Sequence, residues 1–265
     1  MRGGQGRDKL LGGSGTDECA GEEMSGCEMT AVSAGDRGLA VRYLQQRLSE
    51  AMLYRGPIDG VFPEDRVLDS GEASNAWEFP GSMTAAIYAF HKLHRSPAGE
   101  AWTPDDRVSA AWTLADWRRI RRFSPEVPVD REAEPNRFEV DARHEVMWLM
   151  LDGELAGIFH VSVGGEFTYV YRGSEEVAHT PRGDMDFYKY WAGHEYPLCT
   201  WMYRAWYYKH THRGMALHGY CSVPPYPASH GCVRVIYDDA DWIHSRIGGS
   251  AAVGDGVMPI HIWDG

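Results

Sequence analysis

The sequence of 265 residues lacks long apolar runs and has no excess of basic residues. No stretch of 18 apolar residues occurs, so no transmembrane helix is expected. The first 30 residues contain Arg2, Arg7 and Lys9 but no apolar core like that of a signal peptide, so no export signal is visible. The net charge of −12 argues against a nucleic-acid partner, because such a partner requires a basic face.

Cysteine is scarce, and its count is odd. Of the five cysteines, Cys19 lies near Cys27 and Cys199 lies near Cys221, which leaves Cys232 as the fifth. In an oxidising compartment, two disulfides and one thiol would be a coherent pattern. Four cysteines can pair in three ways, so the pairing stays open.

Residues 1–34 form a Gly-rich tail that contains the pattern Gly-Gly-x-Gly-x-Asp twice, at Gly3–Asp8 and Gly12–Asp17. The pattern resembles the calcium-binding nonapeptide of RTX β-rolls. Such a solenoid needs at least three repeats to bury a core, so we expect a disordered tail, and calcium binding stays open.

Residues 35–121 have the periodicity of helices. In a first predicted helix, one face carries Val41, Leu44, Leu48 and Met52, and Gly56-Pro57 ends the helix. A second helix is predicted from Ser82, and a third from Thr103 with Pro104 in its first turn. Residues 122–135 are rich in proline and charge, which predicts a linker.

From residue 136 onward the pattern changes to that of short strands. Asp152-Gly153 separates two apolar segments and predicts a hairpin. One helix is predicted at Asp239–Gly248, and a last strand at Met258–Trp263. The fold class is therefore predicted as α+β, with a small three-helix N-terminal domain and a mainly β domain, sandwich-like or barrel-like, at residues 136–265.

The segment "ALHGYCSVPPYPASHGCVRV", residues 216–235, concentrates reactive side chains. A thiol becomes a good nucleophile only beside a base or a positive charge. Cys232 is the predicted nucleophile, and the N–H groups of Gly231 and Cys232 are candidate donors to an oxyanion. His218 and His230 compete for the role of base, and spacing places His218 only slightly ahead.

This segment resembles the signature of the L,D-transpeptidase catalytic domain of the YkuD type, and the resemblance extends over roughly residues 136–263. It implies that Cys232 accepts the acyl group and that His218, oriented by the Gly219 carbonyl, takes the thiol proton. It also implies site-shaping roles for Ser229 and His230, a substrate-binding role for Arg234, and a place for Tyr203 beside the oxyanion hole.

The helical segment resembles the three-helix peptidoglycan-binding domain of cell-wall enzymes, with an apparent insertion at Pro63–Gly81. Together the resemblances imply a cysteine-dependent L,D-transpeptidase of the cell envelope, or of an extracellular location, with peptidoglycan as its partner. Two alternatives are an L,D-carboxypeptidase and a non-catalytic peptidoglycan-binding protein.

Metal binding is a rival interpretation. His91, His94, His210, His212 and His218 include residue types that bind zinc. The histidines at 210 and 212 lack a correctly spaced second pair of ligands, so no metal is expected. No cofactor is expected either, because a thiolate and an imidazole suffice for acyl transfer.

Overall fold

The computed structural model describes residues 30–68, 77–94, 110–129, 131–193, 202–209, 214–249, 252–253 and 256–264. Three features predicted from the sequence lie outside these residues: the two Gly-rich repeats, the helix expected from Thr103, and the cysteines at 19, 27 and 199. Cys221 is disulfide-bonded, and Cys232 is a thiol outside any disulfide.

The N-terminal part is mainly helical and the C-terminal part mainly β. The helices are α1 (Leu39–Glu50), α2 (Ser82–Leu93), α3 (Leu114–Ile120) and α4 (Tyr237–Ile247). The strands are β1 (Arg66–Leu68), β2 (Trp77–Phe79), β3 (Arg137–Asp141), β4 (Val146–Leu151), β5 (Glu154–His160), β6 (Thr168–Tyr171), β7 (Ser174–Val177), β8 (Gly183–Asp186), β9 (Lys189–Trp191), β10 (Tyr203–Lys209), β11 (Met215–Gly219), β12 (Val233–Val235), β13 (Ala252–Val253), β14 (Gly256–Val257) and β15 (Pro259–Trp263).

Two sheets form the frame of the β part. The larger has the strand order β5-β4-β3-β15-β8, and the smaller has the order β12-β11-β10-β9. β3 with β15, and β11 with β12, are parallel pairs, while the other neighbours in these two sheets are antiparallel. Ser162, just after β5, pairs with Arg234 of β12, so the two sheets are joined beside the SHGC segment.

The predicted hairpin at Asp152-Gly153 is present between β4 and β5. Asp152 has φ 53° and Gly153 has φ 83°. Two consecutive left-handed residues are what a tight two-residue hairpin turn requires, and Asp-Gly is a favoured pair for it. The predictions of a helix near Asp239 and of a last strand near Met258 also hold, as α4 and β15.

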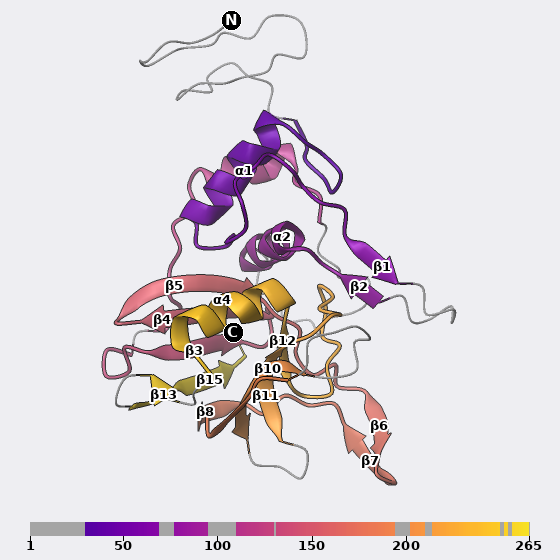
Figure 1. Cartoon of the computed structure of the whole chain (residues 1–265), viewed down its shortest axis with the longest axis vertical. Helices are drawn as coiled ribbons and strands as arrows, with labels where there is room; N and C mark the ends of the chain where they lie inside the picture. Colours follow the sequence, from indigo (N-terminus) through magenta and orange to yellow (C-terminus); the bar gives the residue numbers. More distant parts are fainter. Residues whose placement is uncertain are drawn as a thin grey trace, which may run out of the picture.

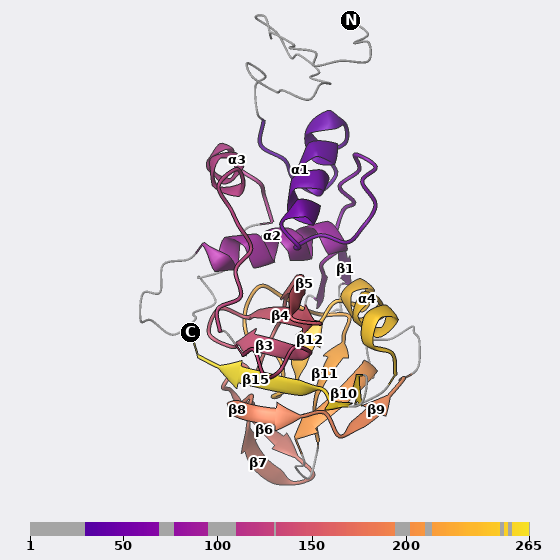
Figure 2. The same cartoon turned by 90° about the vertical axis from the view of Figure 1, so that its left-hand side faces the viewer.

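β4 explains how the two parts of the chain are held together. Its sequence VMWLML is almost wholly buried because both faces of the strand are covered. Met147 and Leu149 belong to the core between the two sheets and α4, whereas Val146 and Trp148 belong to a second core with residues of α1, α2 and α3. The helical part therefore packs on the outer face of the larger sheet, with α2 lying over β5 (Figures 1 and 2).

α1 is shorter than its sequence periodicity predicts. Val41, Leu44 and Leu48 are buried as expected. Met52 lies beyond the helix, with φ 60° and 40% exposure, so its expected place on the buried face is wrong. The chain turns at this residue so that the amide of Ile158 can donate to Met52 O at 2.8 Å, and this contact with β5 replaces a further helical turn.

α3 begins with a capping box. Thr113 Oγ1 accepts from the Asp116 amide at 3.4 Å, and the Thr113 amide donates to Asp116 Oδ2 at 2.8 Å. These two bonds satisfy donors that a helix start leaves without intrahelical partners. Among the residues that the structure describes, no helix is both long enough and apolar enough to cross a membrane.

Candidate active site

Parallel pairing of β11 and β12 brings the ends of the reactive segment together. His218 is in register with Arg234, while Leu217 is in register with Val233. Leu217 and Val233 belong to the core between the sheets, so the alternation of side chains places His218 and Arg234 on the opposite face. Cys232 lies in the turn just before β12, two residues from Arg234, and is half-buried and packed against that core.

His218 is buried and held in one tautomer. The residue is only 3% exposed, and its Nδ1 lies 2.9 Å from the Gly219 carbonyl oxygen. Because a carbonyl only accepts, Nδ1 carries the proton, and Nε2 keeps a lone pair that can accept one. Burial, together with the nearby Arg234 guanidinium, lowers the pKa of His218 to about 3 against the opposing effect of the Gly219 hydrogen bond.

Arg234 is the positive charge of this face. Its guanidinium lies over the Tyr220 ring, 4.3 Å from the ring centroid. The same ring meets the His218 imidazole edge to face, at 5.8 Å between centroids. Burial lowers the pKa of Arg234, while Tyr220 and Cys232 act electrostatically in the opposite direction. Arg234 is therefore within electrostatic reach of both His218 and Cys232.

Ser229 fixes the backbone of the SHGC turn. Its hydroxyl donates to the Cys232 carbonyl at 2.6 Å and accepts from the Gly231 amide at 3.0 Å. The Gly231 N–H therefore points to the serine, which contradicts the expectation that it serves an oxyanion. The sequence singles out Ser229 and Gly231, but it does not show that the buried Ser229 hydroxyl accepts the hydrogen bond of the Gly231 N–H.

Gly231 is required by the tightness of the turn. Its φ is 126°, a value that residues with a side chain rarely adopt, and an added Cβ would lie 2.6 Å from the His179 carbonyl oxygen. Its own carbonyl accepts from Thr180 Oγ1 at 3.0 Å and from the Tyr208 hydroxyl at 3.3 Å. The turn that carries Cys232 is thus held from both sides.

His230 is exposed and turned toward the β6–β7 hairpin. Its ring meets Phe167 at 5.3 Å and Tyr169 at 4.5 Å between centroids, both edge to face. Unlike His218, it is not a buried imidazole. These contacts are compatible with a site-shaping role and favour His218 over His230 as the base.

Tyr203 lies between the smaller sheet and α4. Its hydroxyl donates to Asp241 of α4 at 2.6 Å, and its ring packs against Gly219 and Tyr237. Tyr203 is in register with Gly219, which neighbours His218 and so faces the other side of the sheet from that imidazole. These contacts give the ring a structural role, and its place beside an oxyanion hole stays a prediction.

Two other tyrosines of β10 lie near the thiol instead. Burial raises the pKa of Tyr208, as does the electrostatic effect of Cys232, and the same two causes raise the pKa of Tyr207. Tyr208 also donates to the carbonyl of Gly231. The sequence of β10 indicates only an aromatic strand. Because the pairing of β10 with β11 shifts in register, the sequence alone does not predict which ring contacts the turn that carries Cys232.

A buried ionic cluster supports the Pro-rich loop between the two motifs. Lys92 of α2, fully buried, lies 3.1 Å from Glu145 Oε2 and 3.0 Å from His160 Nδ1. His160 Nε2 lies 3.0 Å from the Val223 carbonyl oxygen. Burial and the Lys92 charge lower the pKa of His160 well below its usual value, so the imidazole is neutral and donates to Val223. No sequence signal linked α2 to this loop.

Metal ligands are not gathered in the described part of the chain: no group of three His, Cys, Asp or Glu side chains there could hold an ion. His91 contacts Asp116, and His94 contacts the carbonyl of Phe90. The histidines at 210 and 212 lie outside the described residues.

A buried neutral imidazole and a guanidinium on one sheet face, with a thiol in the adjoining turn, form an arrangement suited to cysteine acyl transfer. Residues 135–262 match the model of the YkuD family, the L,D-transpeptidase catalytic domain. This β-rich part is therefore similar to the L,D-transpeptidase catalytic domain of the YkuD type.

A solved structure of TM-score above 0.5 supports the same fold. The crystal structure of an L,D-transpeptidase from Xylanimonas cellulosilytica DSM 15894 is 24% identical, with a TM-score of 0.66 over 88% of this chain and 98% of that chain. An L,D-transpeptidase from Stackebrandtia nassauensis is 17% identical, with a TM-score of 0.40 over 88% of this chain and 94% of that chain. A search of curated proteins finds no match.

Proposed function

We propose that the protein is a cysteine-dependent L,D-transpeptidase that remodels or cross-links peptidoglycan through a thioester on Cys232. The observation that carries the proposal is a neutral His218, fixed by Gly219 and in register with Arg234, on the strand beside the one that Cys232 directly precedes. A buried neutral imidazole whose Nε2 can accept a proton is what a cysteine acyltransferase needs as its base.

In the first half-reaction, His218 Nε2 takes the proton of the Cys232 thiol as sulfur attacks the amide carbonyl that joins an L-configured to a D-configured centre in a tetrapeptide stem. The Cys232 N–H is the expected donor to the oxyanion. The C–N bond then breaks, His218 returns the proton to the leaving amine, and D-Ala departs. Arg234 offers a charge to the substrate carboxylate or backbone.

In the second half-reaction, an amine of a neighbouring stem attacks the thioester carbonyl, and the thiolate of Cys232 leaves. Water in place of the amine would give carboxypeptidase activity. We propose in addition that the helical N-terminal part binds peptidoglycan, on the basis of its resemblance to cell-wall binding domains. The envelope, or an extracellular location, is the proposed site of action.

The test is to incubate the full chain with purified disaccharide-tetrapeptide, with and without a soluble primary amine, and to identify the products by mass spectrometry. We expect release of D-Ala and an amide-linked adduct that depends on the amine. Release of D-Ala with water as the only acceptor would make the protein a carboxypeptidase. Unchanged muropeptide with folded protein would contradict the proposal.

A further inference from the structure

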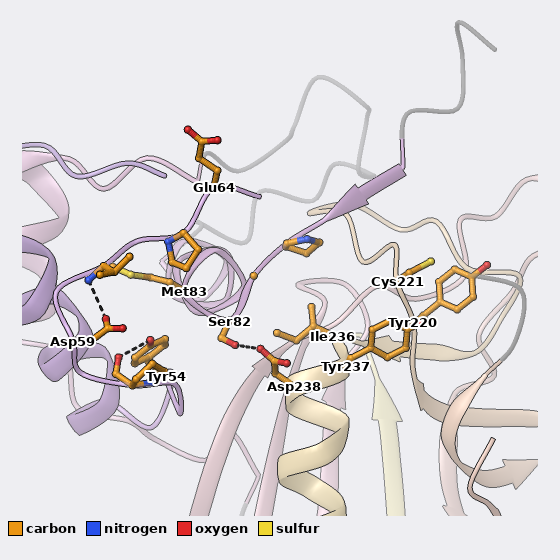
Figure 3. Close-up of a pocket in the computed structure, with 15 residues that line it drawn as sticks. Tyr54, Asp59, Glu64, Ser82, Met83, Tyr220, Cys221, Ile236, Tyr237 and Asp238 are labelled. Carbon is orange, nitrogen blue, oxygen red and sulfur yellow. Dashed lines mark hydrogen bonds between the residues drawn. The ribbon is translucent and has the colours of Figure 1, made fainter. Parts of the chain in front are cut away.

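A cleft lies between the helical part and the β part, outside the site described above. Its volume is about 470 Å³, which is within the usual range for sites that bind small molecules. One wall comes from residues 54–64 and the start of α2, and the other from the end of β11 and the start of α4 (Figure 3). Neither Cys232 nor His218 lines it.

The charges that line this cleft are all negative. Asp59, Glu64 and Asp238 line it, and no Lys, Arg or His side chain does so among the described residues. Tyr54 lies in this negative field: burial, with smaller effects of Asp59 and Asp238, raises its pKa to about 12. Such a cleft attracts a cation and repels a carboxylate.

Two of the carboxylates are held in place by the protein. Asp59 Oδ1 accepts from Gln45 Nε2 and from the Val61 amide, each at 2.9 Å. Asp238 Oδ2 accepts from the Ser82 hydroxyl, a bond that joins α4 to α2 across the cleft (Figure 3). These bonds use Oδ1 of Asp59 and Oδ2 of Asp238. The negative charge of the cleft is thus a fixed feature of the fold.

The remaining lining is aromatic and apolar. The rings of Tyr54, Tyr220 and Tyr237 and the side chains of Met83 and Ile236 form the walls between the carboxylates. Such walls suit the methylene chain of an aliphatic amine, while the carboxylates suit its charged end.

Tyr220 connects this cleft to the candidate active site. The ring that closes one end of the cleft is the ring that packs edge to face on His218 and beneath the guanidinium of Arg234. A molecule that leaves the cleft past Tyr220 therefore arrives at the imidazole that the proposed mechanism uses as base.

We propose that this acidic cleft binds the amine-bearing acyl acceptor, a peptide with a primary aliphatic amine, and delivers it to the thioester from the His218 side. The inference rests on the proposed function, which it extends by assigning the acceptor its own site. The acceptor enters as an ammonium ion and loses one proton to solvent. Its nitrogen then forms a C–N bond with the thioester carbonyl and gives a second proton to His218 Nε2, as the C–S bond breaks and the Cys232 thiolate leaves.

The experiment uses the full chain and the double variant Glu64→Gln/Asp238→Asn, which removes two negative charges and retains hydrogen-bond acceptors. The matched control is Glu126→Gln/Asp152→Asn, which removes two exposed charges that do not line the cleft. Two rates are measured: acyl-enzyme formation with a carbapenem, by intact mass, and transfer from a tetrapeptide donor to a soluble diamino acceptor peptide. We expect the acceptor KM to rise about fivefold or more in the cleft variant, with acylation within about twofold of wild type.

Several results would overturn the inference. They are an unchanged acceptor KM in the cleft variant, an equal rise in the control variant, or competitive inhibition of transfer by an amine-free glycan, which would make the cleft a sugar site. If wild type forms the acyl-enzyme but only water discharges it, the acceptor site is refuted while the cysteine chemistry stands. If folded wild type forms no acyl-enzyme, the proposed function fails first.

Discussion

His218 is neutral in the resting site, and this sharpens the role that the sequence assigned to it. The signature predicts a base, and an imidazolium beside the thiol would have been one way to activate it. With its pKa lowered to about 3, the imidazole holds no charge near pH 7 and accepts a proton only when the thiol gives it up. The standing positive charge near Cys232 belongs to Arg234.

This division of roles predicts two different outcomes. His218→Ala should slow acylation at least about a hundredfold, the usual scale for loss of a general base. It should shift the pH profile of iodoacetamide alkylation at Cys232 only slightly, since a neutral ring stabilises no thiolate. Arg234→Gln should move that profile to higher pH, because a nearby cation favours the thiolate. A large upward shift in His218→Ala alone would show that the resting pair is ionised.

Tyr203 and Tyr208, both in β10, offer a second comparison. Tyr203→Phe removes a bond to Asp241 and should lower the free energy of unfolding by about 1 kcal/mol, with acylation nearly unchanged. Tyr208→Phe removes a donor to Gly231 in the turn that carries Cys232, so acylation should fall more. The measurement is the acylation rate of each variant beside its urea unfolding curve. If Tyr203→Phe slows acylation more than Tyr208→Phe, the structural assignment of Tyr203 is wrong.

At the scale of residues, the sequence predicted which residues form the candidate site, but not which hydrogen-bond donor pairs with which acceptor. His218, Gly219, Ser229 and Cys232 follow from a short signature whose spacing is local. The fate of the Gly231 N–H depends on the rotamer of a buried serine, and such a rotamer is set by contacts from distant strands.

At the scale of elements, α2 is part of the support of the candidate site. Its residue Ala85 packs with Val223 and Ile236 in a small core, and Lys92 reaches the same loop through His160. The loop between His218 and Cys232 therefore rests on a helix of the N-terminal part.

Removing the charge of Lys92 should disturb both stability and catalysis. Lys92→Met leaves Glu145 buried without its cation and should cost about 3 kcal/mol of unfolding free energy, with slower acylation. Lys92→Met/Glu145→Gln leaves no buried charge, and Gln can still accept from the Val163 amide, so much of the stability should return. Urea unfolding of both variants measures this. A loss below about 1 kcal/mol in the single variant would contradict the account.

The elements themselves were the most predictable level. Asp152-Gly153, the α4 helix and the β15 strand carry local signals, namely a turn pair, a helical period and a β-branched run. The end of α1 was missed because Met52 leaves the helix for a contact with β5, which is distant in sequence. The parallel pairing of β3 with β15 joins the two ends of the β part, and no local pattern reports such a pairing.

At the scale of the whole molecule, the helical and β parts share a core at β4 and β5, and several buried ionisable groups lie at or near this junction. Buried Asp239 of α4, 3.9 Å from Arg55, has its pKa raised to about 6 by burial. His160 and His218 have lowered pKa values. The stability of the protein should therefore depend on pH.

The sign of this dependence follows from proton uptake. Below pH 6.5 the unfolded chain protonates both histidines while the folded chain does not, so their contribution is complete above pH 6.5 and is lost as the pH falls, for His218 toward its folded pKa of about 3. Asp239 acts oppositely between about pH 6 and its unfolded value near 4, because its folded form takes up the proton first. Two histidines outweigh one carboxyl, so we expect these groups to lower the stability from pH 6.5 to 4.5.

Urea unfolding at several pH values measures this slope. His218→Gln removes one of the two histidines and should reduce the slope by up to about 1.4 kcal/mol per pH unit. Stability that rises on acidification over this range, or an unchanged slope in the variant, would contradict the assigned protonation states.

The central claim is that Cys232 is the acyl-accepting nucleophile, and intact-mass analysis after exposure to a carbapenem tests it most directly. Wild type should gain the mass of one acyl group, while Cys232→Ala, which changes little packing in a half-buried turn, should remain folded and gain none. An adduct of equal yield on folded Cys232→Ala would contradict the account.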